Sequence, residues 1–234
     1  MNNEEVNLTN DSYSLHRILK TDIKKDPNNQ EDEIIFGCGC FWGAEKCFWK
    51  LPGVVTTSVG YAGGEKNNPT YYEVCSGLTG HSEVVRVIWD KREIDISDLL
   101  KMFWECHDPT QKNRQGNDMG TQYRSAIYYK NENNIKTILA SKEQYQTELS
   151  KKNLGLIETE IKMIDSYFYA EQYHQQYLAS AGSRQYCSAS PTKVKLGVFT
   201  GSNYKLEDHI WENFNWEVDK CVLRSDNNPI KNNI

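Results

Sequence analysis

The sequence predicts an α+β protein with a mixed, largely antiparallel sheet and flanking helices, a ferredoxin-like α/β sandwich core, and an irregular C-terminal tail. Strand-like and helix-like segments alternate between residues 33 and 178. The connections at Pro52-Gly53 and at 82–91 are too short for every pair of strands to be joined by a parallel crossover. Beyond Ser190 the apolar patterning weakens. Helices packed on a mixed sheet account for these three observations.

Each element is predicted from the spacing of its apolar residues and from the glycines and prolines that bound it. Strands show short apolar runs, whereas helices repeat apolar residues every three or four positions and stop at Pro-Gly or at His-Asp-Pro. Polar stretches that carry glycine and tyrosine indicate ordered loops. In chain order we expect a strand over 33–38, a helix from 40 to the Pro52-Gly53 stop, a strand over 54–61, a loop over 65–80, a strand over 83–89, a helix over 96–103 that stops near 107, a loop over 111–120, a strand over 123–129, a helix over 135–149, a strand over 157–164, a short helix over 170–178, and one or two helical turns around 206–214.

Composition divides the chain into three parts. Residues 1–30 are rich in Asn, Asp and Lys and are expected to form a flexible N-terminal arm that docks at one point. Residues 31–190 hold the patterned elements and form the expected catalytic domain. Residues 191–234 form a C-terminal extension with few structural signals.

Charge and hydropathy exclude several classes of partner. The 234-residue chain has a net charge of −5, which argues against nucleic acid or an anionic membrane as its main partner. It contains no long apolar run of the kind that crosses a membrane. Its polar, acidic N-terminus differs from a secretory signal or a transit peptide. These features predict a cytoplasmic protein, which we expect to be a monomer.

The chain has seven cysteines, an odd number that does not suit a complete disulfide framework. Most of them are expected to be buried, reduced thiols that pack as small apolar residues. A reactive thiol among them must have special surroundings.

One cysteine has such surroundings, in the stretch GCGCFWGAEKCF at residues 37–48. Cys40 follows a strand and begins a helix, where unpaired N–H groups and the helix dipole favour thiolate over thiol. Phe41 and Trp42 offer an apolar wall beside its sulfur. Together these residues predict a nucleophile next to a pocket for a small apolar group. Cys38 points the same way along the strand, but a disulfide across one intervening residue is badly strained, so we expect it to be packed.

Glu83 is the candidate proton donor for this nucleophile. By the two-residue period of a strand it shares a face with Val85, Val87 and Trp89. A carboxyl at the end of an apolar face is partly desolvated and therefore favours its neutral form, which a general acid requires at neutral pH. A solvated position at the strand start is the alternative.

Three more polar groups lie in the glycine-bearing loops. They are the hydroxyls of Tyr71 and Tyr123 and the carboxyl of Asp118. Taken singly, each is also compatible with a structural turn or a packed tyrosine.

Five segments in order resemble the A-type peptide methionine sulfoxide reductases. The similarity covers about residues 33–190. The segments are GCFWGAE at 39–45, GYAGG at 60–64, NPTYYEVCSGLTGH at 68–81, HDPTQKNRQGNDMGTQYRSAIYY at 107–129 and YHQQYL at 173–178.

The resemblance implies a thiol oxidoreductase that reduces the S epimer of methionine sulfoxide, free or in proteins, without a metal or organic cofactor. It implies Cys40 as the nucleophile and Glu83 as the acid. It places Tyr71, Asp118 and Tyr123 as polar pocket residues, and Phe41 with Trp42 against the substrate methyl group. Cys40 would become a sulfenic acid, which a second thiol converts to a disulfide that thioredoxin reopens.

The resemblance also implies a resolving cysteine in the C-terminal segment. Cys187, in SRQYCSAS, stands where related chains carry it. Cys221 comes 34 positions later and has no other thiol after it. It is either a recycling cysteine or an unreactive residue of the tail, and the sequence leaves both open.

Three other functions share part of this pattern of residues. A structural zinc site usually needs paired close ligands, and the chain offers only Cys38-x-Cys40 and Cys106-His107. A thiol peroxidase would also use a reactive and a resolving cysteine, but it needs neither a neutral glutamate nor an aromatic wall. A non-catalytic binder of oxidised methionine would have no need for both Cys40 and Glu83.

Overall fold

A six-stranded sheet forms the centre of the computed structural model, which describes residues 14–218 and 221–232. Its strands lie in the order β7-β6-β1-β3-β2-β8, and every pair is antiparallel except β6 and β7. The predicted mixed, largely antiparallel sheet is therefore confirmed. The strands are β1 (Glu31–Cys38), β2 (Val54–Ala62), β3 (Ser82–Asp90), β6 (Ser125–Tyr129), β7 (Glu160–Met163) and β8 (Tyr167–Tyr169), and a separate short hairpin pairs β4 (Arg114–Gln115) with β5 (Asp118–Met119).

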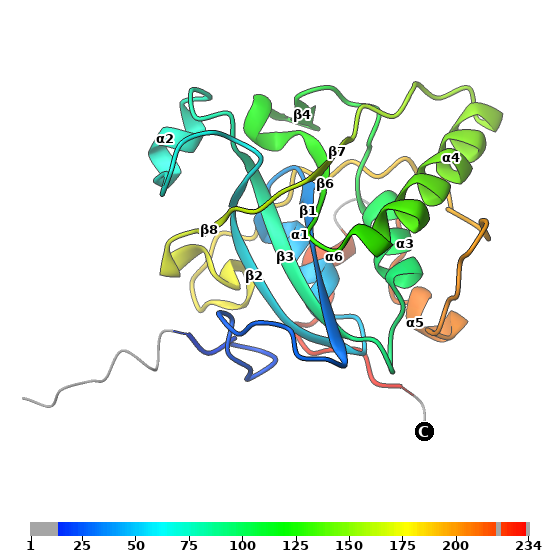
Figure 1. The fold of residues 1–234 in the computed structure, drawn as a ribbon, viewed down its shortest axis with the longest axis horizontal. Coiled ribbons are helices and arrows are strands. Elements are labelled where there is room, and N and C mark those ends of the chain that lie inside the picture. Colours follow the sequence, from blue (N-terminus) through cyan, green and yellow to red (C-terminus); the bar gives the residue numbers. More distant parts are fainter. Residues whose placement is uncertain (1–13, 219–220, 233–234) are drawn as a thin grey trace, which may run out of the picture.

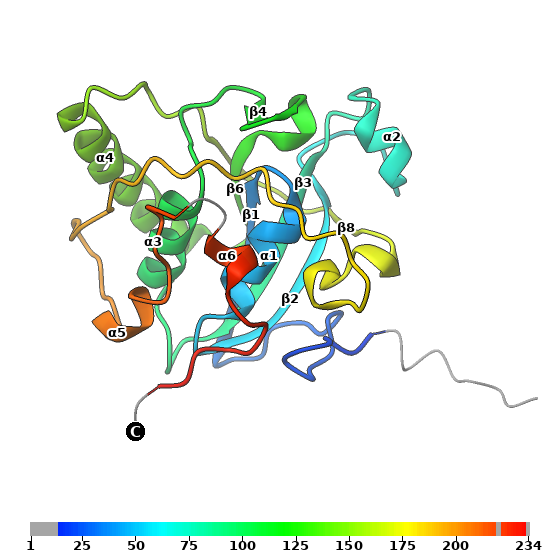
Figure 2. The same cartoon turned by 180° about the vertical axis from the view of Figure 1, so that it is seen from behind.

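Helices α1 and α3 cover one face of this sheet, and α4 lies against α3 at its side (Figure 1, Figure 2). The core fills the space between α1, α3 and the strands. Phe36 of β1 stacks between Phe48 of α1 and Phe103 of α3, with ring centroids 4.9 and 5.0 Å apart. The helices are α1 (Phe41–Trp49), α2 (Tyr71–Cys75), α3 (Ile96–Cys106), α4 (Ile135–Lys151), α5 (Asp208–Trp211) and α6 (Cys221–Arg224).

The described part of the N-terminal segment, residues 14–30, lies beside β2 (Figure 1). His16 is fully buried and its Nε2 is 2.9 Å from the hydroxyl of Thr57. Ile23 is buried as well. Residues 1–13 of the predicted arm lie outside the described residues.

The C-terminal extension runs back over α3 and α1 instead of adding to the sheet (Figure 2). The main-chain N–H of Leu196 donates to Glu105 of α3 at 2.9 Å. Trp49 Nε1 of α1 donates to the carbonyl of Asn227 at 3.0 Å, and the N–H of Ile230 donates to the carbonyl of Lys50 at 2.9 Å. The extension therefore buries the outer surfaces of both helices.

Several predicted elements differ from the structure. The helix expected over 170–178 is wrong, because two 3₁₀ turns, Gln172–His174 and Tyr177–Ala179, stand there instead. Gln176 between them has a left-handed backbone with φ of 47°, which ends any continuous helix.

The loop expected over 65–80 contains α2, which begins at a capping box formed by Thr70 and Glu73. The strand expected over 157–164 is shorter, and β8 was not predicted. No helix in the described parts of the chain is long and apolar enough to cross a membrane.

Candidate active site

Eight side chains from distant parts of the sequence line one small pocket at the start of α1. Its volume is about 60 Å³. All the residues that the sequence placed at the site, apart from the two C-terminal cysteines, meet here. The lining residues are Cys40, Phe41, Trp42, Tyr71, Glu83, Asp118, Tyr123 and Tyr186.

Cys40 lies at the junction of β1 and α1, as the sequence predicted. It is the N-cap residue of α1, one residue after Gly39. Gly39 has a left-handed φ of 87°, and a Cβ on it would lie 2.6 Å from the side chain of Gln115. Only glycine fits this turn, and the turn fixes the position of Cys40 at the start of α1.

Glu83 is the second residue of β3 and its side chain is buried, 2% exposed. The main-chain N–H of Phe41, the first of α1, donates to its Oε2 at 3.1 Å. Burial, assisted by the nearby Asp118, raises the pKa of Glu83 to about 8, although the Phe41 N–H opposes that shift. At neutral pH the carboxyl is therefore mostly protonated, whereas the alternative of a solvated Glu83 does not hold.

The Cys40 thiol is not activated in the way the sequence predicted. Burial raises the pKa of Cys40 well above its ordinary value, and the negative charge of Glu83 raises it further. The N–H of Trp42, at the helix N-terminus, acts in the opposite direction but is outweighed. The expectation of a lowered pKa is therefore wrong for this structure. Since the Glu83 charge is one cause, protonation of Glu83 removes part of the penalty on a Cys40 thiolate.

Two phenols face the same pocket and stay protonated. Burial raises the pKa of both Tyr71 and Tyr123 above the ordinary value, and Glu83 raises both further. Tyr71 begins α2, where its main-chain N–H donates to Glu171 at 2.9 Å. Each hydroxyl is thus a hydrogen-bond donor at neutral pH.

Asp118 stands on the short strand β5 and accepts a hydrogen bond from the hydroxyl of Tyr186 at 2.6 Å. The carboxylate therefore holds a phenol from the segment that carries Cys187. Tyr186 was not predicted, although it directly precedes Cys187 in SRQYCSAS.

The apolar wall is held by the 3₁₀ turns at 172–179. Trp42 Nε1 donates to Nδ1 of His174 at 3.1 Å, and its ring stacks on Tyr177 with centroids 3.9 Å apart. Burial lowers the pKa of His174 to about 4, so the ring is neutral and Nδ1 can accept. Phe41 packs beside His174 at 5.2 Å.

A buried carboxylate fastens these turns to α1. Glu45 is fully buried, and its oxygens accept from the N–H of Gln176 at 2.8 Å, from Gln176 Nε2 at 2.7 Å and from Thr57 at 3.0 Å. Burial raises its pKa to about 7, although these donors oppose the shift. The bonds to Gln176 explain the left-handed turn that breaks the predicted helix. Glu45 belongs to the GCFWGAE motif, but the sequence did not predict its supporting role.

Cys187 packs against α1 at Gly43, which is one helical turn after Cys40. A Cβ on Gly43 would lie 2.5 Å from the Cys187 sulfur, so only glycine lets the thiol approach this closely. A cavity of about 20 Å³ adjoins it and is lined by Cys47, Cys106, Cys187 and Cys221 together with apolar residues. The structure thus brings both C-terminal cysteines to one place.

One set of buried side chains has the composition of a metal site. Donor atoms of Cys38, Cys106 and His107 lie within 4.8 Å of one another. Both ring nitrogens of His107 are already engaged, however, Nδ1 with the carbonyl of Phe103 and Nε2 with Ser125, each at 2.7 Å. A metal would have to break one of these short bonds, so the residues do not fit a zinc centre.

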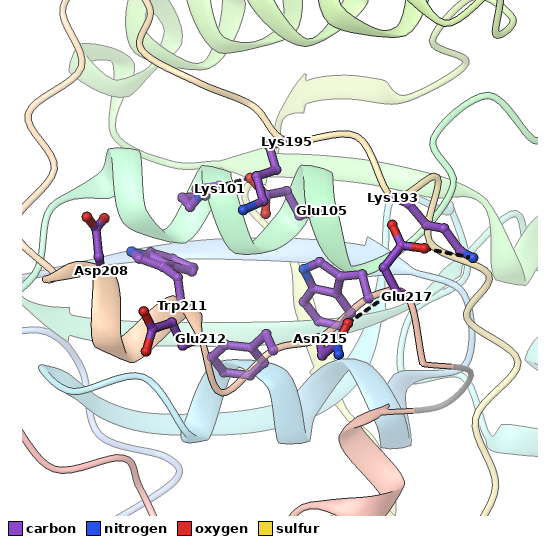
Figure 3. A pocket seen from close by; sticks show the side chains of 11 residues that line it. Lys101, Glu105, Lys193, Lys195, Asp208, Trp211, Glu212, Asn215 and Glu217 are labelled. Atoms are coloured by element: carbon purple, nitrogen blue, oxygen red, sulfur yellow. Dashed lines mark hydrogen bonds and ion pairs between the residues drawn. The ribbon is translucent and has the colours of Figure 1, made fainter.

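A larger hollow lies between the C-terminal extension and α3 (Figure 3). Its volume is about 660 Å³, and it shares no lining residue with the Cys40 pocket. Among its seven charged lining residues, Lys101 pairs with Glu105 at 2.6 Å and Lys193 with Glu217 at 3.2 Å. The other three are Lys195, Asp208 and Glu212.

The fold and the pocket define a class of protein, a cysteine-dependent enzyme. A sulfur at a helix start faces a carboxyl that is neutral at pH 7, two phenol donors and an aromatic wall. Residues 32–204 match the model of the family described as peptide methionine sulfoxide reductase. The chain belongs to the peptide methionine sulfoxide reductase family.

Individual relatives agree with this assignment. The chain is 53% identical over 180 residues to the peptide methionine sulfoxide reductase MsrA of Vibrio vulnificus, covering 77% of this chain and 86% of that protein. It is 57% identical to the MsrA of Azotobacter vinelandii over 70% of this chain and 76% of that one. A solved structure, methionine sulfoxide reductase A of Corynebacterium diphtheriae, has a TM-score of 0.67 at 42% identity and covers 78% and 88% of the two chains. Reduced Mxr1 of Saccharomyces cerevisiae has a TM-score of 0.64 at 34% identity and covers 70% and 92%.

Proposed function

We propose that this chain reduces the S epimer of methionine sulfoxide, free or in proteins, with Cys40 as the nucleophile and Glu83 as the acid. The observation that carries the proposal is the placement of a protonated Glu83 carboxyl in the same 60 Å³ pocket as Cys40 and the Phe41–Trp42 wall. Family membership supports the reaction, and the geometry supports the roles of the residues.

The proposed first step transfers the sulfoxide oxygen to the enzyme. The Cys40 sulfur bonds to the sulfoxide sulfur while Glu83 gives its proton to the oxygen, because an unprotonated oxide is a poor leaving group, and the proton released by the Cys40 thiol restores Glu83. Tyr71 and Tyr123 donate hydrogen bonds to the same oxygen. The protonated oxygen then passes from the substrate sulfur to the Cys40 sulfur, so the S–O bond of the substrate and the transient S–S bond break, methionine leaves, and Cys40 becomes a sulfenic acid.

The wall explains why one epimer is preferred. With the methyl group against Phe41 and Trp42, the oxygen toward Glu83 and the rest of the methionine side chain toward the pocket opening, only one arrangement of these groups around the chiral sulfur fits. The other epimer would turn either its oxygen toward the aromatic rings or its methyl group toward the carboxyl.

Cys187 is proposed to resolve the sulfenic acid. Its thiol displaces water from Cys40–SOH and forms a Cys40–Cys187 disulfide. The close contact of Cys187 with Gly43 supports this step. Cys221, which lines the same small cavity, is proposed to exchange with Cys187 and to pass the disulfide to thioredoxin. The alternative is that Cys221 is a structural residue of the tail.

The test is a reduction assay with separated S and R sulfoxide epimers, using dithiothreitol and then thioredoxin as the donor. We expect methionine to be released from the S epimer only. Cys40→Ser should abolish single-turnover release, whereas the matched control Cys38→Ser should retain it, since Cys38 lies outside the pocket lining. Normal release by Cys40→Ser would remove Cys40 from the mechanism.

We also propose that the protein acts in the cytoplasm as a monomer. An odd number of thiols suits a reducing compartment. Light scattering of the purified protein should give a mass near the 27.1 kDa of one chain. A stable mass of twice that value would contradict the monomer.

A further inference from the structure

Residues 14–24 of the N-terminal segment form a small ordered loop on β2 (Figure 1), which we call the docked arm. An isolated bridge pairs Leu15 with Asp22, and the hydroxyl of Thr21 donates to the carbonyl of Val55 on β2 at 2.7 Å. The active-site pocket is lined by none of these residues. The role of the docked arm must therefore be sought in what its buried side chains and main-chain groups hold.

His16 is the fully buried centre of the docked arm. Its Nδ1 accepts from the N–H groups of Ile18 and Leu19 at 3.1 and 3.0 Å. Burial lowers the pKa of His16 to about 3, so the ring is neutral and its one proton lies on Nε2. Nε2 therefore donates to the hydroxyl of Thr57, at 2.9 Å. That hydroxyl keeps its own proton for Glu45, to which it donates at 3.0 Å.

A second link joins the docked arm to the same carboxyl group. The main-chain N–H of Arg17 donates to Oε1 of Gln176 at 3.2 Å, and Arg17 Nε donates to the carbonyl of Gln175 at 3.4 Å. The other end of the Gln176 amide, Nε2, donates to Glu45 at 2.7 Å. The amide of Gln176 is thus held at both ends, by the docked arm and by α1.

Gln176 needs such support because its backbone is left-handed, with φ of 47°. A residue with a Cβ keeps this conformation only where its surroundings hold it there. The 3₁₀ turns on either side of Gln176 carry His174, which accepts from Trp42 Nε1, and Tyr177, which stacks on the Trp42 ring. Loosening of Gln176 would therefore loosen the aromatic wall.

We propose that the docked arm is a positioning element of the enzyme. Through His16 and Arg17 it holds Gln176, and thereby Trp42, in the arrangement that receives the methyl group of the substrate. The proposal rests on the proposed function of the Cys40 pocket. Because the docked arm reaches no reacting atom, cutting its links should weaken substrate binding and spare the chemical step.

The test is the kinetics of free methionine S-sulfoxide reduction by the full chain. The apparent affinity falls with the fraction of molecules whose wall is in place. His16→Ala should therefore raise KM about five-fold, the factor that corresponds to one hydrogen bond, and leave the single-turnover rate at saturating substrate unchanged. Thr57→Val cuts the same link from the other end. The double variant should be no worse than the weaker-binding single variant, because both changes break one network.

The matched control is Ile23→Ala, which removes another buried side chain of the docked arm, 3% exposed, that takes part in neither link. It should lower the unfolding temperature and leave KM unchanged. An equal rise in KM for Ile23→Ala and His16→Ala would show that the arm acts only through general stability. That result would overturn the proposal, as would an unchanged KM in His16→Ala or effects that multiply in the double variant.

Hydrogen exchange over residues 172–180, followed by mass spectrometry, separates this proposal from the proposed function. His16→Ala should speed exchange of this segment about five-fold, whereas Ile23→Ala should leave it unchanged. If the wild type reduced no sulfoxide yet the two variants differed in this way, the proposed function would fail and the support of the wall by the docked arm would stand. Unchanged exchange in His16→Ala would overturn the proposal.

Discussion

Replacing Glu83 with Gln tests the central claim that a neutral acid lies beside Cys40. The variant keeps the size of the side chain and an oxygen that can accept from the Phe41 N–H, which donates to Glu83 at 3.1 Å. It removes only the transferable proton. We therefore expect the pocket to keep its shape while the attack on the sulfoxide slows.

The magnitude follows from the pKa of Glu83, which burial raises from 4.5 to about 8. At pH 7 a group with pKa near 8 is roughly nine-tenths protonated, whereas one at its ordinary value would be protonated about 300-fold less often. Burial thus accounts for nearly all of the protonated Glu83 that is present at pH 7. Its loss in Glu83→Gln should lower the rate by about 10²-fold or more, the usual effect of removing a general acid.

The assay is single-turnover methionine release between pH 6 and 10. Glu83 loses its proton as the pH rises through about 8, so the wild-type rate of methionine release should fall above that pH. Glu83→Gln should be slow and should lack this fall. Thermal unfolding at pH 7 serves as the control for folding. Activity within a few-fold of wild type at pH 7 would refute the reasoning and leave Tyr71 or Tyr123 as the proton source.

Further changes test the thiol path and the support of the pocket. Gly43→Ala should slow Cys40–Cys187 disulfide formation but spare the first methionine release, because its Cβ would meet the Cys187 sulfur at 2.5 Å; rapid-quench mass spectrometry checks this. Cys187→Ser should release one methionine and then stall in thioredoxin-driven cycles and in cycles that are poor in dithiothreitol, whereas Cys221→Ser should slow only the thioredoxin-driven cycle. Peptide mapping that always found Cys221 reduced would make it a structural residue. Burial raises the pKa of Glu45 to about 7, so its protonated form contributes on the order of 3 kcal/mol to the free energy of unfolding below pH 4.5. This contribution is lost as the pH rises through 7. Urea unfolding of Glu45→Gln should therefore show a smaller loss of stability between pH 5 and 8 than urea unfolding of the wild type.

The sheet and most of the pocket could be predicted because their signals are local. The period-two run at 83–89 identifies a buried strand, and the glycine before Cys40 identifies the turn into α1. The motifs then name residues from separate segments of the chain that only the fold brings together. Tyr71, Asp118 and Tyr123 have no periodicity of their own, so their meeting at Cys40 follows from the resemblance and from the structure, and not from their local sequence.

The remaining features depend on tertiary contacts that no local pattern encodes. The 170–178 segment has a helical apolar spacing, but Glu45 takes both the main-chain N–H and the side chain of Gln176 and holds that residue in a left-handed conformation. Likewise, the thiol pKa of Cys40 depends on how deeply the helix start is buried. The dipole of a helix favours thiolate, yet burial beside a carboxyl outweighs it here.

Two sides of helix α1 support different proposed steps of the reaction. Cys40, Gly43 and Cys47 are spaced three and four positions apart and so follow one side of the helix, toward Cys187 and the small thiol cavity. Trp42 and Glu45 follow another side, toward the 3₁₀ turns that hold the aromatic wall. One nine-residue helix thus positions the proposed nucleophile, the proposed resolving thiol and the aromatic wall that we propose holds the substrate methyl group. A change at Gly43 or Cys47 on the first side should therefore slow resolution of the sulfenic acid and spare methionine release, whereas a change at Trp42 or Glu45 on the second side should affect substrate binding and spare the disulfide step.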